Sequence, residues 1–225
     1  MSFPDSAAVA QYAVNLVKQV PGLHALHKMA HVLLAEHVPT NGRVLVLGAG
    51  GGMELKALAQ ASPAWRFTGV DPSPEMLALA KRTLGKFACR VDFVEGLVES
   101  APDREFDGAT CLLTLHFLSL EERLRTLREL KRRLRPGAPL VIAHHSVPDA
   151  TEEKLAWFQR WAAFTTDDGL HTEATLSRAT QMATRLPTLP PECEVELLEL
   201  AGFERVRLFY AALSFRGWVA RARNV

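Results

Sequence analysis

Residues 43–52 read RVLVLGAGGG, an aliphatic run that ends in a cluster of glycines. The run is short, continuous and partly β-branched, which is typical of a parallel strand buried on both faces. Glycines directly after such a strand let the backbone turn sharply and approach a ligand closely, with the next helix N-terminus aimed at it. The stretch therefore predicts a strand, a ligand-binding loop and a helix in succession.

An acid stands where a nucleotide site of this kind needs one. Asp71 closes the next predicted strand, residues 66–70, and lies 19 residues beyond Gly52. Its carboxylate can accept hydrogen bonds from both ribose hydroxyls of an adenosine. A glycine cluster alone is a weak signal, but strand, loop, helix and acid together indicate a ligand that contains adenosine.

The spacing of the glycines favours S-adenosylmethionine (SAM) over a dinucleotide. The dinucleotide fingerprint G-x-G-x-x-G/A requires a small residue at its sixth position, where Met53 stands. The pattern G-x-G-x-G is instead satisfied by Gly48, Gly50 and Gly52. NAD or FAD remains an alternative, as does a glycine turn in a domain that binds no nucleotide.

Strand and helix patterns alternate from residue 43 onward. Further strands are predicted at 66–70, 91–94, 106–111 and 139–143, and helices at 54–61, 75–84 and 120–134. Such alternation predicts a parallel sheet with helices on both faces. The last two strands, 205–210 and 214–221, are joined by a link so short that only an antiparallel hairpin fits. We therefore predict an α/β fold with a seven-stranded Rossmann-like sheet, mostly parallel, with a C-terminal antiparallel hairpin.

Two helical segments lie outside this alternation. Residues 1–39 read as two helices on either side of Pro21-Gly22, and we expect them to form an N-terminal helical lid. Residues 40–225 are expected to form the SAM-binding domain, with a helical insertion at 151–190. Aromatic residues recur in the insertion at helical spacing: Trp157, Phe158, Trp161 and Phe164. Core or lid packing is the usual meaning of that pattern, and an apolar wall for a substrate is the alternative.

The composition is that of a packed globular protein. The 225 residues are 48% hydrophobic and 23% charged, with a net charge of +1, so no strong field draws the chain to nucleic acid or to an anionic membrane. Residues 123–135 interleave arginines and lysines with leucines at helical spacing. We interpret this run as the solvated face of an amphipathic helix, with an RNA-binding patch as the alternative. No apolar run is long enough to span a bilayer, and the N-terminus does not read as a signal peptide.

The cysteines argue against a metal site and against disulfides. Cys89, Cys111 and Cys193 are odd in number, and no two of them have metal-ligand spacing. We therefore expect no metal and a cytoplasmic location. The expected partner is a small-molecule substrate, and a homodimer is left open.

Several stretches together carry a resemblance to a known family. They are residues 20–22, the glycine loop, and residues 71–76, 113–118, 201–203 and 215–220. With these in view, the chain resembles class I SAM-dependent methyltransferases, most closely the carboxy-SAM synthases of tRNA wobble-uridine modification. The similarity covers nearly the whole chain, and residues 151–190 match worst.

The resemblance implies a set of cofactor contacts. Its glycine-loop, ribose-side and adenine-side positions, together with Gly52 and Met76 from the local motifs, give the following candidates: Leu23, Gly48, Ala49, Gly50, Gly52, Asp71, Pro72, Met76, Leu97, Val98 and Leu112. Three of these positions are polar in the synthases, being a tyrosine at Leu23, an acid at Leu97 and an asparagine at Leu112. The arginine that holds the extra carboxylate of carboxy-SAM aligns with Arg178.

One further position departs from the methyltransferase pattern. The strand before the loop often carries an acid two residues before the first glycine, where it helps to hold the methionine amino group, and Val46 stands there. Glu54, just past the loop, is a substitute, although an ordinary acid in a first helical turn is an equal alternative.

Methyl transfer from SAM is an in-line displacement in which the protein mainly positions the reactants. A general base is needed only if the acceptor must lose a proton. The candidates are His144 and His145 at the end of the fifth predicted strand and His116 after the fourth, where ligands of open α/β sheets bind. A structural or exposed role is the more common one for each of them.

The predicted function is therefore that of a SAM-dependent methyltransferase with an unidentified small-molecule acceptor. A carboxy-SAM synthase-like enzyme is one alternative. A catalytically degraded SAM-binding protein is the other, because leucines stand at positions where the synthases are polar.

Overall fold

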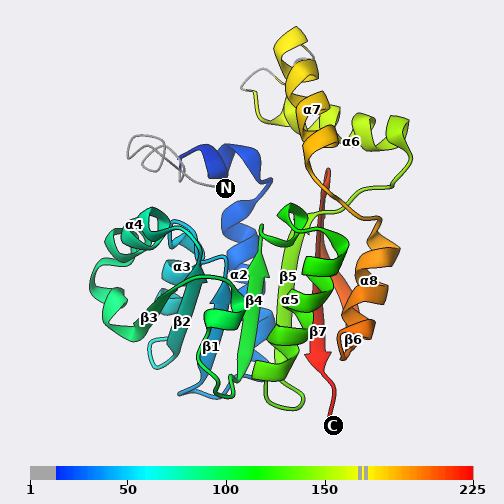
Figure 1. Cartoon of the computed structure of the whole chain (residues 1–225). Helices are drawn as coiled ribbons and strands as arrows, with labels where there is room; N and C mark the ends of the chain where they lie inside the picture. The colour runs from blue at the N-terminus through cyan, green and yellow to red at the C-terminus, as the bar shows by residue number, and fades with distance from the viewer. Residues whose placement is uncertain (1–13, 167–168, 170–171, 225) are drawn as a thin grey trace.

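A computed structural model describes residues 14–166, 169 and 172–224. It contains a seven-stranded sheet with the strand order β3-β2-β1-β4-β5-β7-β6 (Figure 1). The strands are β1 Arg43–Leu47, β2 Arg66–Asp71, β3 Val91–Glu95, β4 Gly108–Leu112, β5 Pro139–His145, β6 Phe203–Ala212 and β7 Phe215–Ala222. Strands β1 to β5 pair in parallel, whereas β7 is antiparallel to both β5 and β6. The predicted α/β fold with a terminal antiparallel hairpin is confirmed.

Strand β1 lies at the middle of the parallel part and is buried on both faces. Successive side chains of a strand point to opposite faces of the sheet. Val44 and Val46 accordingly pack into one core, and Leu45 and Leu47 pack into the other. An aliphatic residue is needed at each of these positions, which explains why the run shows no polar alternation.

Helices cover both faces of the sheet. Helices α2 (Leu23–Ala35), α3 (Met53–Ala61) and α4 (Pro74–Leu84) contribute to one core. Helices α5 (Leu120–Arg133) and α8 (Pro191–Leu200) contribute to the other and contact each other. Short 3-10 turns follow several strands: η1 Gly85–Arg90, η2 Val98–Ser100 and η3 Leu115–Phe117. In the described part of the chain, no helix is both long enough and apolar enough to cross a membrane.

Helices α6 (Thr151–Phe164) and α7 (Glu173–Arg185) lie beyond the carboxyl ends of the parallel strands (Figure 1). The two helices pack against each other. Phe158 and Trp161 are almost fully buried, with exposed fractions of 0% and 2%. These helices make up most of the predicted 151–190 insertion, and they place it at the end of the sheet where ligands bind.

The N-terminal residues divide into two parts. Residues 14–19 are helical and lie on the other side of the Pro21-Gly22 turn from α2, as the sequence predicts. Helix α2 contacts α3, β4 and β5, and its Ala30 and Leu34 have no exposed surface. Helix α2 is therefore part of the core. Of the predicted 1–39 lid, residues 14–20 are the described portion that lies before the Pro21-Gly22 turn, and residues 1–13 lie outside the described residues.

The fourth strand begins two residues later than predicted. Gly108 is its first residue, and Phe106 instead forms an isolated parallel bridge with Leu134. The reason lies in the backbone of the preceding residues. The Phe106 N–H donates to the Arg133 carbonyl at 2.8 Å, and the Asp107 carboxylate accepts from the Arg43 N–H at 2.8 Å. These bonds pair Phe106 with the end of α5 and anchor Asp107 to Arg43, so regular pairing with β1 begins at Gly108.

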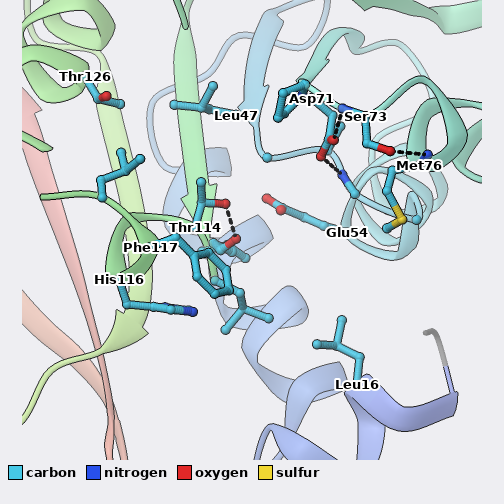
Figure 2. Close-up of a pocket in the computed structure, with 18 of the residues that line it drawn as sticks. Leu16, Leu47, Glu54, Asp71, Ser73, Met76, Thr114, His116, Phe117 and Thr126 are labelled. Carbon is cyan, nitrogen blue, oxygen red and sulfur yellow. Dashed lines mark hydrogen bonds between the residues drawn. The ribbon is translucent and has the colours of Figure 1, made fainter. Parts of the chain in front are cut away.

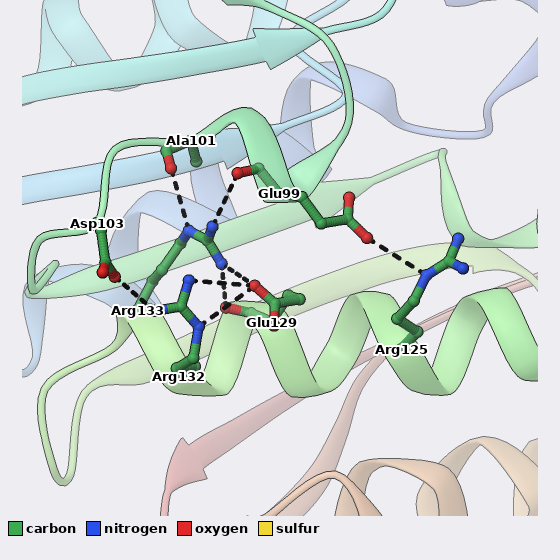
Figure 3. A network of polar contacts seen from close by, with 7 residues as sticks. All are labelled: Glu99, Ala101, Asp103, Arg125, Glu129, Arg132 and Arg133. Atoms are coloured by element: carbon green, nitrogen blue, oxygen red, sulfur yellow. Dashed lines mark hydrogen bonds and ion pairs between the residues drawn. The ribbon is translucent and has the colours of Figure 1, made fainter.

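The basic run on α5 is only partly a solvated face, which corrects the prediction. Arg133 is buried and donates to the backbone carbonyls of Ala101 and Glu99 at 3.4 and 3.1 Å (Figure 3). Arg132 pairs with Asp103, and Arg125 Nε lies 3.3 Å from Glu99 Oε1 (Figure 3). Much of the positive charge of α5 is therefore paired with carboxylates and carbonyls of the same protein.

Candidate functional site

A pocket of about 470 Å³ opens at the carboxyl ends of β1, β2, β4 and β5 (Figure 2). Its size falls within the range of about 300–1,000 Å³ that small-molecule sites occupy. Because β1 lies between β2 and β4, the pocket spans the sheet from Asp71 on one side to His145 on the other. Ligands of open α/β sheets bind at this edge.

The glycine loop is held in a left-handed backbone conformation at alternate residues. The φ angles of Gly48, Gly50 and Gly52 are 75°, 48° and 81°. A Cβ atom on Gly48 would lie 2.0 Å from Thr114 Oγ1, and one on Gly52 would lie 2.7 Å from Ala80 Cα. Two of the glycines are thus required by packing within the protein as well as by backbone conformation.

Asp71 joins the end of β2 to this loop. Its Oδ2 accepts from the Gly50 N–H at 2.8 Å, and its Oδ1 accepts from the Ser73 N–H at 3.0 Å (Figure 2). Burial raises the pKa of the carboxyl, and these two N–H groups oppose that rise. A carboxylate has about four acceptor positions, so Asp71 keeps acceptor capacity toward the pocket that it lines.

Glu54 is the second acid of the pocket. It lies in the first turn of α3, is 7% exposed, and points into the space between Ser73 and Thr114 (Figure 2). Its Oε1 is buried without a hydrogen-bond partner among the described residues. Burial raises its pKa to about 7, and the neighbouring Thr110 hydroxyl opposes that rise. A buried carboxylate oxygen that lacks a partner, in a pocket wall, fits a cationic group of a ligand.

The remaining predicted cofactor residues take different places. Ala49, Pro72, Met76, Val98 and Leu112 line the pocket with Gly48, Gly50, Gly52 and Asp71. Leu97 also lines it, but it lies at the rim and is 53% exposed. Leu23 does not line the pocket. It is 2% exposed and belongs to the same core cluster as Leu26 and Ala30 of α2, so its side chain is used in core packing.

The structure separates the three histidine candidates. His116 and His145 line the pocket, whereas His144 does not. His144 Nε2 lies 2.9 Å from Glu194 Oε1, and Glu194 is ion-paired with Arg123. Adjacent residues of β5 must point to opposite faces, so only one of the pair can reach the pocket. His144 is therefore removed from the candidates.

Both remaining histidines are neutral. Burial, with a smaller effect of His144, lowers the pKa of His145 to about 3. Burial also lowers the pKa of His116 well below its usual value, and His145, His144 and Arg123 add to that effect. Neither imidazole carries a charge near neutral pH.

Several residues of the pocket wall are absent from the sequence-based list. Phe117 and Thr114 follow β4, Phe215 begins β7, and Leu16 and Val20 come from the N-terminal segment. Most of these residues lie in stretches that carry the family resemblance, but nothing local marks them as pocket residues, because only the closed fold brings their elements together. Trp161 was anticipated in part, because an apolar wall for a substrate was the alternative interpretation of the aromatic residues at helical spacing in the insertion.

The wall opposite the glycine loop is tied together by long-range hydrogen bonds. Trp161 Nε1 donates to the Gln19 carbonyl at 2.9 Å, and the Tyr210 hydroxyl donates to the Pro21 carbonyl at 2.6 Å. The N-terminal segment is thereby fixed to α6 and β6. Gln19 and Trp161 both line the pocket, so this connection closes one side of it.

Arg178 lies behind this wall. Its guanidinium donates to Thr165 Oγ1 at 3.0 Å and lies over the Trp161 ring, 4.8 Å from its centroid. Arg178 does not itself line the pocket. The arginine that the resemblance aligns with the synthases is thus near the site, separated from it by a tryptophan.

Comparisons with known proteins agree with this geometry. A family model for a methyltransferase domain matches residues 44–137. The carboxy-S-adenosyl-L-methionine synthase of Chromohalobacter salexigens is 31% identical over 223 residues, which cover 96% of this chain and 82% of the relative.

Solved structures show the same fold at lower identity. Human N-acetylserotonin methyltransferase in complex with SAM has a TM-score of 0.63 and 18% identity, covering 99% of this chain and 58% of that chain. A chain in the complex that contains the Haloferax volcanii Trm112 methyltransferase activator has a TM-score of 0.68 and 18% identity, covering 97% of each chain.

The fold and the pocket define a SAM-dependent transferase of the class I methyltransferase type. The chain belongs to this methyltransferase family, in the branch that contains the carboxy-SAM synthases. Its cofactor is SAM, which agrees with the glycine loop, the acid after β2 and the buried Glu54 carboxylate in the pocket wall.

Proposed function

We propose that the protein transfers the methyl group of SAM to a small-molecule acceptor and does not make carboxy-SAM. The charge of the pocket wall carries this proposal. Among the described residues, Arg125 is the one lysine or arginine that lines the pocket, and its Nε lies 3.3 Å from Glu99 Oε1. All other lysines and arginines of the chain are also in the described part. An added carboxylate on the cofactor would therefore lack a free cation, and an unpaired buried charge is costly.

Asp71 is the residue that we propose for the ribose of SAM. Its position at the end of β2 and its remaining acceptor capacity support this role. The backbone of Gly48, Ala49 and Gly50 faces the pocket beside it, and we assign the methionine part of the cofactor to this loop. Gly52 packs against Ala80 of α4 so closely that a Cβ atom would not fit. We therefore assign it a structural role in the loop in addition to its place in the pocket wall.

Glu54 is the residue that we propose for the amino group of the methionine part. The strand acid that commonly fills this role is replaced by Val46, which is fully buried in the core. The Glu54 carboxylate supplies a charge from the other end of the loop, and its unpartnered oxygen supports the assignment. An ammonium group beside it would stabilise its ionised form.

The adenine ring is assigned to the apolar residues on the β2 and β3 side. Pro72, Met76 and Val98 supply packing surface there, and Leu97 covers the rim. Leu112 lies under the loop, and we keep it as an apolar floor contact. We keep Leu23, a core residue, only as a support for the wall behind the pocket.

Carboxy-SAM synthesis is the second candidate function. The observation that favours it is the identity of 31% to a synthase over most of both chains. It would require Arg178 to leave Trp161 and Thr165 and to enter the pocket.

Mass analysis of the cofactor tests the two candidates directly. Protein purified from cells should carry SAM, S-adenosylhomocysteine or no cofactor, and incubation with SAM and prephenate should release no phenylpyruvate. Carboxy-SAM in either preparation would overturn the proposal. In that case Arg178→Met should remove the product, while the exposed Arg160→Met should not.

Two expectations accompany this function. A cytoplasmic setting is supported by the three cysteines, none of which is in a disulfide in the described residues. A homodimer stays a prediction, which the mass in solution would decide.

A further inference from the structure

A cluster of aromatic rings forms the pocket wall opposite Asp71. The His116 and Phe117 ring centroids are 4.2 Å apart, and those of His116 and His145 are 4.9 Å apart. His145 stacks on Phe215 at 3.9 Å and meets the Trp161 ring edge-on at 5.5 Å. All five side chains line the pocket. With the ribose at β2 and the cofactor crossing β1, this wall faces the reactive end of SAM.

The tautomer of His116 is fixed by one hydrogen bond. The backbone N–H of His145 donates to His116 Nδ1 at 3.3 Å. A backbone N–H can only donate, so Nδ1 must keep its lone pair, and the neutral ring carries its proton on Nε2. In Figure 2 the His116 side chain extends into the pocket below Phe117.

His116 is therefore suited to donate a hydrogen bond and is unsuited to remove a proton. The titratable and charged groups around it are His145 and His144 on β5 and Arg123 on α5, and all of them disfavour its protonation. His145 is a weak base as well, because burial lowers its pKa to about 3, and its Nδ1 lies 2.8 Å from Ser214 Oγ.

The other titratable groups of the described lining on this side are also occupied or weak bases: burial lowers the pKa of His27 to about 4, Glu122 accepts hydrogen bonds from Ser119, and Glu99 is paired with Arg125. We therefore infer that the acceptor itself provides an ionised atom.

We propose that the acceptor is an aromatic compound with an acidic hydroxyl group, and that it binds as its oxyanion with His116 Nε2–H donating to that oxygen. This inference rests on the proposed methyl transfer. Phe117, which is 49% exposed, provides an open ring face for a flat molecule, and the buried rings of the cluster support it. The described wall offers no free cation for a carboxylate or phosphate, whereas a single oxyanion is matched by the sulfonium of SAM and one N–H donor.

The chemistry balances without a proton transfer to the protein. A lone pair of the oxyanion forms the new oxygen–carbon bond to the methyl group as the carbon–sulfur bond breaks. The bonding pair leaves on sulfur, so the negative charge of the acceptor and the positive charge of the sulfonium cancel. His116 holds the oxygen in line, and the hydrogen bond weakens as the ether forms.

The experiment uses the full chain with SAM and a series of substituted phenols that differ in acidity. The value of kcat/KM should rise with pH to a plateau, with a midpoint that follows the pKa of each phenol. His116→Leu should lower kcat/KM by roughly 100-fold, and His116→Gln, which keeps a donor near Nε2, should retain more activity. SAM affinity should be the same in both variants, which shows that they fold.

A binding measurement provides a second readout. A nitrophenol that titrates near neutrality changes colour on ionisation, so its absorbance in the complex with the protein and S-adenosylhomocysteine reports its protonation state. We expect the bound phenolate to be favoured in the wild type and less so in His116→Leu.

Two results would overturn the inference while leaving methyl transfer intact. One is a midpoint that stays the same for every phenol, which would indicate a base on the enzyme. The other is failure to methylate any phenol by a preparation that binds SAM and contains no carboxy-SAM. Detection of carboxy-SAM would instead refute the proposed function on which the inference rests.

Discussion

Asp71 and Gly50 are joined by a hydrogen bond of 2.8 Å, from the backbone N–H of the loop to the carboxylate that follows β2. Asp71 is the last residue of β2, and Gly50 lies in the loop that follows the neighbouring parallel strand β1. One carboxylate therefore both shapes the loop and faces the cofactor pocket. A substitution at Asp71 should affect ligand binding more than it affects the fold.

Asp71→Ala should weaken SAM binding by about ten- to a hundred-fold, the effect of losing hydrogen bonds to a charged acceptor. Isothermal calorimetry measures this directly. Asp103→Ala is the matched control, because that carboxylate is 81% exposed, pairs with Arg132, and does not line the pocket. Unchanged SAM affinity in Asp71→Ala would remove the ribose assignment.

Gly50→Ala should reduce SAM binding while the protein remains folded. The residue has a φ of 48°, where a side chain costs roughly 1–2 kcal/mol, and it lines the pocket in which we propose that SAM binds. Gly137→Ala also places a side chain at a positive φ, 77°, with no atom within 4 Å of its Cβ, and Gly137 does not line the pocket. Equal SAM affinity in the two variants would mean that the loop is only a turn. Gly50→Val should abolish binding.

Glu54 should make the stability of the free protein depend on pH. A glutamate in the unfolded chain titrates near about 4.3, and burial raises the pKa of Glu54 to about 7. The folded state holds the extra proton between these values, so the free energy of unfolding should fall as pH rises through this window. Glu54→Gln should remove that fall, a gain of about 3 kcal/mol above neutrality. Denaturation at several pH values measures it, with the exposed Glu196→Gln as control.

The same variant tests the proposed ligand of Glu54. Loss of a charged partner should weaken S-adenosylhomocysteine binding by about tenfold or more. Methylthioadenosine has no amino acid part, so its affinity should not change. An equal loss for both ligands would show that Glu54 acts on the pocket shape and does not contact the amino group.

The buried pair of Arg123 and Glu194 should be essential for stability. Both side chains have no exposed surface, and Arg123 also donates to the Pro187 carbonyl at 2.9 Å. Glu194→Gln should lower the free energy of unfolding by about 3–5 kcal/mol, because the arginine is left buried without its partner. Asp103→Ala, which breaks an exposed pair, should cost less than about 1 kcal/mol. Similar losses in both variants in urea denaturation would contradict this account.

Much of the cofactor half of the site can be predicted from the sequence. The glycine loop and Asp71 are local features at the ends of two strands, and parallel strands bring those ends to the same edge of a sheet. Glu54 was recognisable as a candidate by its place after the loop. Its lack of a partner was not, because that depends on which side chains surround it in three dimensions.

Most residues on the side of the pocket that we assign to the methyl acceptor could not be identified from the sequence. The sequence alone gives no reason to choose between His144 and His145. In the structure the register of β5 against β7 directs His144 to Glu194 and His145 to the pocket. Phe215 and Val20 come from opposite ends of the chain. Arg178 aligned with a synthase residue but stacks on Trp161 instead.

By itself the sequence determined the α/β class, the parallel sheet with its terminal hairpin, and the strand ends where the cofactor loop and its acid lie. Those features depend on hydrophobic period, glycine and proline positions, and link length, which are all short-range properties of the chain. Only the tertiary structure decided which histidine faces the pocket, which basic residues are paired, and which aromatic rings meet. These are contacts between residues far apart in sequence, and they are set by how the side chains of separate elements fill one shared space.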